Sequence, residues 1–403
     1  MNDESQVGNA DSQSRHAAEI EVDMPRDSTE GSLLFSPFRL RGLDLPNRIV
    51  VSPMCQYSAD EDGCANEWHL AHLGQLALSG TGLLITEAVA VEPRGRITRR
   101  CVGLYSDANE AALARVVDYV RRYGGARLGI QIGHSGRKGS VQVPWEGGKP
   151  LSEAQGAWPV IGPSALAYDE GWPVPGEATA DDLTAIREAY VATTERAARA
   201  GFDLVEFHTA HGYLMNEFLS PLTNGRRDAY GGHLKGRMRF PLEVFSAMRA
   251  VWPDEKPMGV RVSGTDWVEG GWTLEDAVAF SAALKDCGAD YVVVSSAGIS
   301  PAQQIAMGPA YQVPFAEEIR RRTAITTMAV GSITSGQKAE AALREGKADL
   351  IAVARGFLAD PRWPWRAALA LGAEVPFCPP QYLRGKSTAG FASSRRKLDA
   401  AAR

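Results

Sequence analysis

Cysteine is scarce in this sequence, and the few that occur lie far apart. The 403 residues include five, namely Cys55, Cys64, Cys101, Cys287 and Cys378. An odd, scattered set is typical of a protein kept in a reducing compartment, and it predicts a cytoplasmic location without a disulfide framework. The spacing also excludes a zinc or iron–sulfur site built from closely spaced cysteines.

Long hydrophobic runs and a strong net charge are also absent. No apolar stretch approaches the roughly 18 residues of a membrane-spanning helix, and the N-terminus has no apolar core of a signal peptide. The 43 Lys and Arg residues against 48 Asp and Glu residues give a formal charge of −5. A mildly acidic chain is not expected to bind nucleic acid, which usually requires a basic face.

The composition divides the chain into a long central segment and two tails. Residues 1–31 are rich in Ser, Asp and Glu, and we expect a disordered N-terminal tail there. Residues 385–403 are dominated by Gly, Ser, Ala, Lys and Arg, and are expected to form a flexible C-terminal tail. The segment 32–384 has no linker-like break, and its length is common for a single α/β barrel.

A repeated pattern of helix, glycine and apolar run extends through this segment. Gly201 precedes such a run, and so do Gly80, Gly288 and Gly346. Eight apolar runs separated by amphipathic stretches predict a parallel sheet covered by helices, and their number favours a closed (β/α)₈ TIM barrel over an open doubly wound sheet. The expected strands are Arg48–Val51, Leu83–Thr86, Arg127–Ile132, Leu204–Phe207, Pro257–Val262, Tyr291–Val294, Ile325–Val330 and Leu350–Val353.

Two further patterns refine this fold. Thr179 and Thr273 each stand three residues before an Asp, which predicts capped helix starts at both positions. The interval 133–178 is rich in Gly, Pro and Trp, and is expected to form an elaborated loop after the third strand, at the catalytic face of the barrel.

In barrels of this kind the chemistry lies at the carboxyl ends of the strands. Gly331 and Arg355 follow the seventh and eighth strands, and together they favour a phosphate site, because glycine lets backbone amides approach an anion and arginine pairs with it. A tight turn beside a surface arginine is the alternative. No G-x-G-x-x-G follows a strand, so a dinucleotide bound to a Rossmann fold is not expected.

The segment His208-x-x-His211-x-Tyr213 is the strongest single signal. Two neutral imidazoles can donate hydrogen bonds to one oxygen while a nearby phenol gives up a proton. A histidine pair can also bind zinc, but no acidic or cysteine ligand stands at matching spacing, and no metal is expected. Cys55 is open to three interpretations: a reactive thiol, a group that tunes the site, or a small buried side chain.

Several short sequence motifs of this chain occur together, and in the same order, in a known family. They are Ser52-Pro53-Met54-Cys55-x-Tyr57, Gly95-Arg96-Ile97, Gln131-x-x-His134-x-Gly136-Arg137-Lys138, Pro163-Ser164-Ala165, Gly201-Phe202-Asp203, His208-x-x-His211-Gly212-Tyr213, Phe218-Leu219-Ser220-Pro221 and Asn224-x-Arg226-x-Asp228-x-Tyr230-Gly231-Gly232. From about Leu34 to Arg384 the chain resembles the old yellow enzyme family of FMN-dependent ene-reductases. It is most similar to the shorter bacterial branch that includes the xenobiotic reductases, whose members carry a Cys beside the flavin.

The resemblance implies a tightly bound FMN and assigns residues to it. The isoalloxazine and ribityl chain would be lined by Ser52, Pro53, Met54, Cys55, Ala88, Gln131 and Arg261. The phosphate end would be formed by Gly331, Ser332, Ala354 and Arg355. Glycine usually precedes the phosphate arginine in the family, so Ala354 is a departure that would crowd the backbone.

The resemblance also implies the catalytic and substrate-binding residues. His208 and His211 would bind the carbonyl or nitro oxygen of the substrate, Tyr213 would be the proton donor, and Tyr57 would be a wall of the pocket. Cys55 would adjust the flavin and the substrate contacts rather than act as a covalent nucleophile. Arg384 would reach the site of a neighbouring subunit, which implies a homodimer or homotetramer.

The implied activity is the reduction of activated C=C bonds of α,β-unsaturated carbonyl or nitro compounds by ping-pong hydride transfer, with NADPH or NADH as transient reductant. One alternative is another FMN barrel oxidoreductase, such as a hydroxyacid oxidase or a dihydroorotate-type enzyme. A second is a metal-dependent barrel hydrolase that uses His208 and His211.

Overall fold

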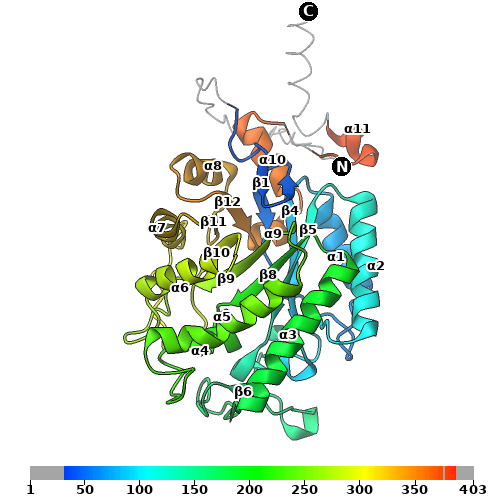
Figure 1. Ribbon diagram of the computed structural model, residues 1–403. Helices are drawn as coiled ribbons and strands as arrows, with labels where there is room; N and C mark the ends of the chain where they lie inside the picture. The colour runs from blue at the N-terminus through cyan, green and yellow to red at the C-terminus, as the bar shows by residue number, and fades with distance from the viewer. Residues whose placement is uncertain (1–30, 375–376, 387–403) are drawn as a thin grey trace, which may run out of the picture. The chain divides into compact units, whose positions relative to one another are not determined.

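The computed structural model describes residues 31–374 and 377–386, so nearly all of the two expected tails lies outside the described residues. Eight strands form a closed barrel in the spatial order β10-β11-β12-β3-β4-β5-β8-β9, and all neighbouring strands are parallel (Figure 1). The predicted TIM barrel is therefore confirmed. Its strands are β3 (Ile49–Val51), β4 (Leu83–Ala90), β5 (Arg127–Gly133), β8 (Leu204–Thr209), β9 (Met258–Ser263), β10 (Tyr291–Ser295), β11 (Thr326–Ala329) and β12 (Leu350–Val353).

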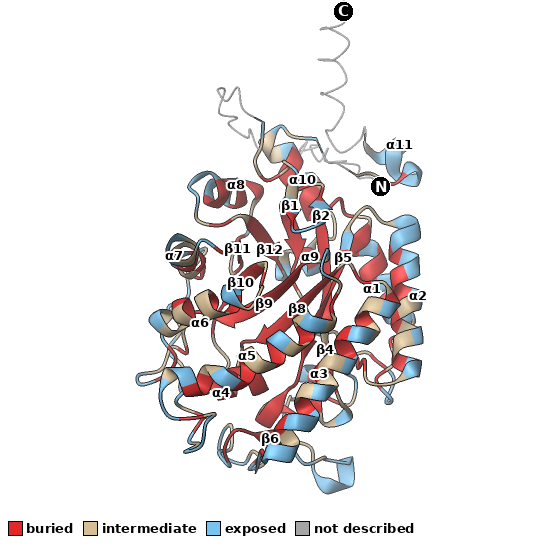
Figure 2. Ribbon diagram, in the orientation of Figure 1, coloured by how far each residue is buried: buried red, intermediate tan, exposed pale blue. Residues whose placement is uncertain are grey.

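Helices surround this barrel, with buried apolar residues toward the strands and exposed residues outward (Figure 2). Both predicted caps are present: the Thr179 and Thr273 side chains accept from the backbone amides of Asp182 and Asp276. No helix in the described part of the chain is long and apolar enough to cross a membrane. The helices are α1 (Glu67–Ala77), α2 (Asp107–Tyr123), α3 (Ala180–Ala200), α4 (Leu214–Leu219), α5 (Leu234–Val251), α6 (Leu274–Asp286), α7 (Val313–Thr323), α8 (Gly336–Arg344), α9 (Arg355–Ala359), α10 (Trp363–Leu371) and α11 (Leu383–Lys386).

A short hairpin closes the amino-terminal end of the barrel. It consists of β1 (Phe38–Leu40) and β2 (Leu43–Leu45), which pair in antiparallel fashion. Leu40 and Leu45 are buried in one apolar cluster with alternate residues of the barrel strands, which line the interior. The barrel axis is therefore filled with side chains at this end, and the opposite end carries the elaborated loops.

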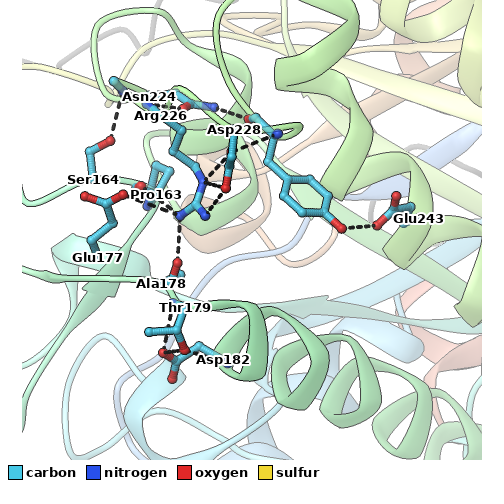
Figure 3. A network of polar contacts seen from close by, with 12 residues as sticks. Pro163, Ser164, Glu177, Ala178, Thr179, Asp182, Asn224, Arg226, Asp228 and Glu243 are labelled. Carbon is cyan, nitrogen blue, oxygen red and sulfur yellow. Dashed lines mark hydrogen bonds and ion pairs between the residues drawn. The ribbon is translucent and has the colours of Figure 1, made fainter.

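The expected elaborated loop after the third barrel strand lies between β5 and α3. It contains the short paired strands β6 (Ile161–Gly162) and β7 (Gly176–Glu177). The Arg226 guanidinium joins the carboxyl ends of both strands, because its Nη1 donates to the carbonyl oxygens of Pro163, at 3.2 Å, and Ala178, at 2.7 Å (Figure 3). Asp228 holds the same guanidinium from the other side. The phrase Asn224–Gly232 is thus a structural clamp that anchors the loop.

Inside the barrel, Gly259 makes room for a large ring. Gly259 on β9 is the register partner of Tyr291 on β10, and a Cβ at position 259 would lie 2.2 Å from Cε1 of Tyr291. Tyr291 is fully buried, and its hydroxyl donates to Oε2 of Glu206 at 3.3 Å. The ring therefore cannot move away without breaking a buried hydrogen bond.

We expect Gly259→Ala to destabilise the protein by about 1–3 kcal/mol, because the added methyl overpacks the barrel interior. Gly308→Ala is the matched control, since a Cβ there would meet no atom within 4 Å. The measurement is the free energy of unfolding from urea titration of the two variants and the natural protein. Equal stability of all three would show that the barrel interior tolerates the methyl.

Candidate active site

The end of β8 and the turn after it bring the predicted histidines and tyrosine together. The ring centroids of His208 and His211 are 5.1 Å apart, and those of His208 and Tyr213 are 5.2 Å apart, each pair edge to face. The turn is tight: His211 has φ +63°, and a Cβ at Gly212 would lie 2.1 Å from the carbonyl oxygen of Gly298 in the loop after β10. The three side chains therefore project from a backbone that another loop holds closely.

A small hollow, with room for about one water molecule, adjoins two of these three side chains. It lies among the segments that follow β4, β5 and β8, and much of its lining is apolar or glycine. The lining residues are Ala88, Val89, Ala90, Gly95, Arg96, Ile97, Cys101, Gly133, His134, Ser135, His208 and Tyr213. The hollow reaches the His208 and Tyr213 rings, and it is smaller than the pockets that hold whole substrates.

Hydrogen bonds define how each imidazole is presented. The Ala210 backbone amide donates to Nδ1 of His208 at 3.2 Å, which leaves the proton of a neutral ring on Nε2. Nε2 of His211 lies 2.7 Å from Oγ of Ser295 at the end of β10. His208 is therefore arranged as a donor through Nε2, and the His211 ring is linked to the barrel interior.

Both imidazoles are kept neutral by their surroundings. The pKa of His208 is well below its ordinary value because the ring is buried and because Arg261 and Lys138 are positively charged neighbours. Burial, Arg261, His208 and Lys138 lower the pKa of His211 in the same way. At neutral pH both rings are uncharged and can donate a hydrogen bond to an oxygen without carrying a full charge themselves.

Arg261 on β9 is the register partner of His208 on the neighbouring strand β8. Its Nη1 donates to Oγ of Ser52 at 2.9 Å, and its Nε donates to Oγ of Ser295 at 3.1 Å. Gln131 donates through Nε2 to Oε1 of Glu206 at 2.7 Å, and the Glu206 carboxylate raises the pKa of Arg261 against the effect of burial. Ser295 and Glu206 were not among the residues predicted from the sequence.

Cys55 and Tyr57 lie on the segment after β3. Burial raises the pKa of the Cys55 thiol well above its ordinary value, and the nearby Glu87 and Cys101 add to this effect. The thiol is therefore protonated at neutral pH, which does not suit a covalent nucleophile. Tyr57 has φ +50°, and its ring packs edge to face against Trp145 of the elaborated loop at 6.2 Å.

The predicted phosphate end lies where β11 and β12 terminate. Gly331 has φ +107° and Ser332 has φ +52°, so two successive residues bend the backbone into the left-handed region, an arrangement that can direct amides toward an anion. Arg355 is exposed and begins α9. Ala354 has a negative φ of −108°, a value that does not by itself require glycine.

The other predicted cofactor-binding residues lie on the segment after β3 and on β4, which are neighbours of β12 and β5 in the barrel. The Ser52 amide donates to the carbonyl oxygen of Val353 at 2.9 Å, which places the segment Ser52–Cys55 beside Ala354. Met54 packs against the hydrophobic core as a partly buried side chain, and Pro53 precedes it on the same segment. Ala88 is partly buried on β4, where the register with β5 shifts between Ile85 and Ala88. The predicted cofactor-binding residues thus lie around one barrel mouth.

Arg384 is the one predicted residue that lies away from this mouth. It belongs to α11, which begins directly after Tyr382. The ring centroid of Tyr382 is 5.0 Å from the Arg362 guanidinium carbon. Arg362 donates to the carbonyl oxygen of Gln75 near the end of α1, on the side where β4 begins. Helix α11, which carries Arg384, is therefore at the amino-terminal end of the barrel (Figure 1).

Comparisons with known proteins identify the family. Residues 33–374 match the model of the NADH:flavin oxidoreductase / NADH oxidase family. The NADPH dehydrogenase of Geobacillus thermodenitrificans (strain NG80-2) is 44% identical over 355 residues, which cover 88% of this chain and 98% of the relative. The NADPH dehydrogenase of Bacillus subtilis (strain 168) is 40% identical over 353 residues, or 87% of this chain and 98% of that protein.

Solved structures agree with this result. Morphinone reductase is 30% identical, with a TM-score of 0.71 over 86% of this chain and 92% of that chain. A variant of morphinone reductase, also 30% identical and with a TM-score of 0.69, was solved in complex with tetrahydroNAD. The closed barrel and its site are those of an FMN-dependent oxidoreductase. The chain belongs to the NADH:flavin oxidoreductase / NADH oxidase family, the family of old yellow enzyme, and its reductant is NADH or NADPH.

The side chains at the barrel mouth fit FMN. A buried guanidinium and an amide, those of Arg261 and Gln131, suit the polar edge of an isoalloxazine ring. At the other end, the bent backbone at Gly331 and Ser332 and the exposed Arg355 suit a phosphate dianion. Among the described residues, no group of three or more His, Cys, Asp or Glu side chains could hold a metal ion. Because the family consists of oxidoreductases, the hydrolase alternative is dropped.

We expect Arg355→Ala to weaken FMN binding at least tenfold, because a guanidinium–phosphate pair contributes roughly 1.5–3 kcal/mol. Flavin retained on gel filtration, measured by absorbance, is the readout. Arg366→Ala on α10, whose guanidinium pairs with Asp360, serves as a control for loss of a surface charge. A yellow Arg355→Ala protein with unchanged affinity for FMN would remove Arg355 from the phosphate site.

Proposed function

We propose that this enzyme reduces the activated C=C bonds of α,β-unsaturated carbonyl or nitro compounds. The observation that carries the proposal is the convergence of two neutral imidazoles and one phenol, from His208, His211 and Tyr213, at the end of one barrel strand. The chemistry that FMN supplies when bound is hydride transfer, first from NADPH or NADH and then to an electrophilic carbon.

The histidines bind and polarise the substrate oxygen. As hydride adds to the β-carbon, negative charge develops on the carbonyl or nitro oxygen, and donors already in place stabilise it. His208 offers Nε2–H, since its Nδ1 accepts from the Ala210 amide. His211 contributes the second donor when its ring releases Ser295. Because both rings are neutral, the substrate and not the protein carries the change in charge.

Tyr213 is the proton donor in this scheme. Burial raises the pKa of its phenol well above the ordinary value, so the group is fully protonated at neutral pH. Its hydroxyl makes no hydrogen bond to a residue in the described ranges 31–374 and 377–386, and it is therefore available to a substrate. Delivery of this proton to the α-carbon completes the reduction.

A single site that both substrates enter in turn would give ping-pong turnover, and Tyr57 would form one wall of that site. The morphinone reductase variant was solved with tetrahydroNAD bound, which supports the proposal that a nicotinamide enters the site of this barrel. Reductant and acceptor would then occupy the same space in turn. Tyr57, supported by Trp145, forms one wall. Arg384 would complete the site of a second copy in a homodimer or homotetramer, since it lies at the opposite end of its own barrel.

The proposal is tested by the absorbance of the purified holoenzyme. Anaerobic NADPH is expected to bleach the flavin band, and cyclohexenone is expected to restore it. The Tyr213→Phe variant should be bleached at an unchanged rate but reoxidised by cyclohexenone roughly 100-fold more slowly, because the general acid is missing. Bleaching by a hydroxy acid instead of NADPH would favour the other class of FMN barrel enzymes and overturn the proposal.

A second prediction concerns the oxygen-binding pair. His208→Ala should weaken the binding of a phenol about tenfold or more while FMN is retained, because a hydrogen bond to a phenolate is lost. The measurement is a titration of flavin absorbance with the phenol. His233→Ala is the matched control, because His233 caps the start of α5 and accepts from the Gly236 amide. Equal phenol affinity in the His208 variant would refute the assigned role.

A further inference from the structure

Lys138 is a positively charged group at the site to which neither the sequence analysis nor the proposed reaction assigns a role. It ends the 3₁₀ turn η2 (Gly136–Lys138), after β5, and its side chain extends toward the turn that carries His211. Its Nζ donates to two backbone carbonyl oxygens, those of His211 and Gly298, each at 2.8 Å. These two bonds fix the ammonium at the junction of the loops after β8 and β10.

Two aromatic rings face this ammonium. Nζ of Lys138 lies 5.0 Å from the ring centroid of Tyr213 and 5.0 Å from that of Tyr168 in the elaborated loop. A cation at this distance over a tyrosine ring is attracted to its π electrons, and the attraction grows when water is excluded. It grows further if the ring gains a negative charge, because two opposite charges then interact directly.

We propose that Lys138 is a positioning residue for proton transfer, whose ammonium stabilises the phenolate that forms on Tyr213 when Tyr213 protonates the substrate. This inference rests on the proposed function of Tyr213. Lys138 itself touches neither the reacting carbon nor the oxygen of the substrate, and it acts through the Tyr213 ring.

The step balances in atoms and charge. Hydride adds to the β-carbon, and the electron pair of the C=C bond moves to the α-carbon and the conjugated oxygen. The proton of the Tyr213 hydroxyl then forms the new α C–H bond, while the O–H electron pair remains on the phenolic oxygen. A proton from solvent later restores the phenol. The phenolate exists between these two events, and that is when a neighbouring cation lowers its energy.

Several charged or titratable groups face Lys138. Burial lowers the pKa of Lys138 to about 8, with Glu217 of α4 raising it and Arg137 lowering it. Burial raises the pKa of Glu217 to about 8 as well. The other facing groups are the phenols of Tyr168 and Tyr213 and the neutral His208 and His211. Lys138 and Glu217 therefore titrate in the same range, and a test must separate them.

The sign of the pH dependence follows from the charged form of Lys138. Below pH 8 the ammonium is present and proton transfer from Tyr213 is assisted. As the pH rises through about 8 the charge is lost, and the rate of the step should fall. A side chain without a titratable amine should give a slower step with no such decrease.

The experiment uses holoenzyme reduced with NADPH and mixed with cyclohexenone in a stopped-flow instrument. In Lys138→Met we expect reoxidation to be roughly tenfold slower, because a desolvated cation–ring interaction is lost. Reduction by NADPH and reoxidation by ferricyanide, which needs no carbon protonation, should stay within about twofold of the natural enzyme. Lys138→Gln keeps donors for the two carbonyls without the charge, and replaces the Met variant if that protein does not fold.

A second readout does not depend on turnover. With ¹³C-labelled tyrosine, the Tyr213 ring signal, assigned by its loss in Tyr213→Phe, should shift near pH 8 in the natural enzyme and not in Lys138→Met. Lys256→Met is the matched control, because Nζ of Lys256 also donates to a carbonyl oxygen, that of Phe202, and lies 5.2 Å from the Trp252 ring. Glu217→Gln separates the two groups that titrate near pH 8.

The outcomes distinguish this inference from the proposed function. A slow Tyr213→Phe enzyme together with a fast Lys138→Met enzyme would overturn the role of Lys138 alone. Loss of the alkaline decrease in Glu217→Gln, with its persistence in Lys138→Met, would also overturn it. If Tyr213→Phe is itself as fast as the natural enzyme, the proposed function of Tyr213 fails first. Slow reoxidation in both variants, with a flat pH profile for Lys138→Met, supports the inference.

Discussion

The rest of the site depends on a positive charge buried inside a closed barrel. The Arg261 guanidinium is removed from water, and an isolated buried cation would cost several kcal/mol. Its neighbours offset this cost. The hydroxyl oxygens of Ser52 and Ser295 accept hydrogen bonds from the guanidinium, and Glu206 lies close enough to stabilise its charge. Ser295 also contacts His211, and the Arg261 charge adds to the effect of burial in lowering the pKa of that ring.

Backbone geometry then decides which groups meet. His208 is on a strand, but His211 is in a left-handed turn whose carbonyl oxygen accepts from Lys138. The close approach of Gly212 to Gly298 joins this turn to the loop after β10. Residues from β5, β8 and β10 are thus held together by backbone contacts and not by side chains alone. Such contacts limit the movement of the His208, His211 and Tyr213 side chains relative to one another.

The barrel and much of the candidate site could be predicted from the sequence, because they depend on local sequence patterns. The barrel follows from apolar runs at regular spacing, the helix starts from threonines with an Asp three residues later, and the trio from its place at one strand end. Ser295 was missed because a serine at the end of an apolar strand is chemically unremarkable until its partners are known. Glu206 offered a signal, a carboxylate inside the apolar run Leu204–Phe207, but its partners come from other strands.

For Lys138, the sequence does not determine where the side chain points. Sequence places it beside Arg137 on a strand-end turn, yet both solvent and the site are within reach of a long flexible side chain. Only the tertiary structure shows the His211 and Gly298 carbonyl oxygens that fix its direction. The N-terminal and C-terminal tails illustrate the reverse, since their predicted disorder lies outside the described residues and stays a prediction.

The β1–β2 hairpin has a consequence for inhibition. With Leu40 and Leu45 packed across the amino-terminal end, the barrel offers no second passage along its axis. Under the proposed activity, a saturated product that lingers at the loop-covered end would therefore obstruct the incoming nicotinamide as well as the next acceptor. Product inhibition should then be relieved by raising the concentration of the reductant, a behaviour that a barrel open at both ends would not impose.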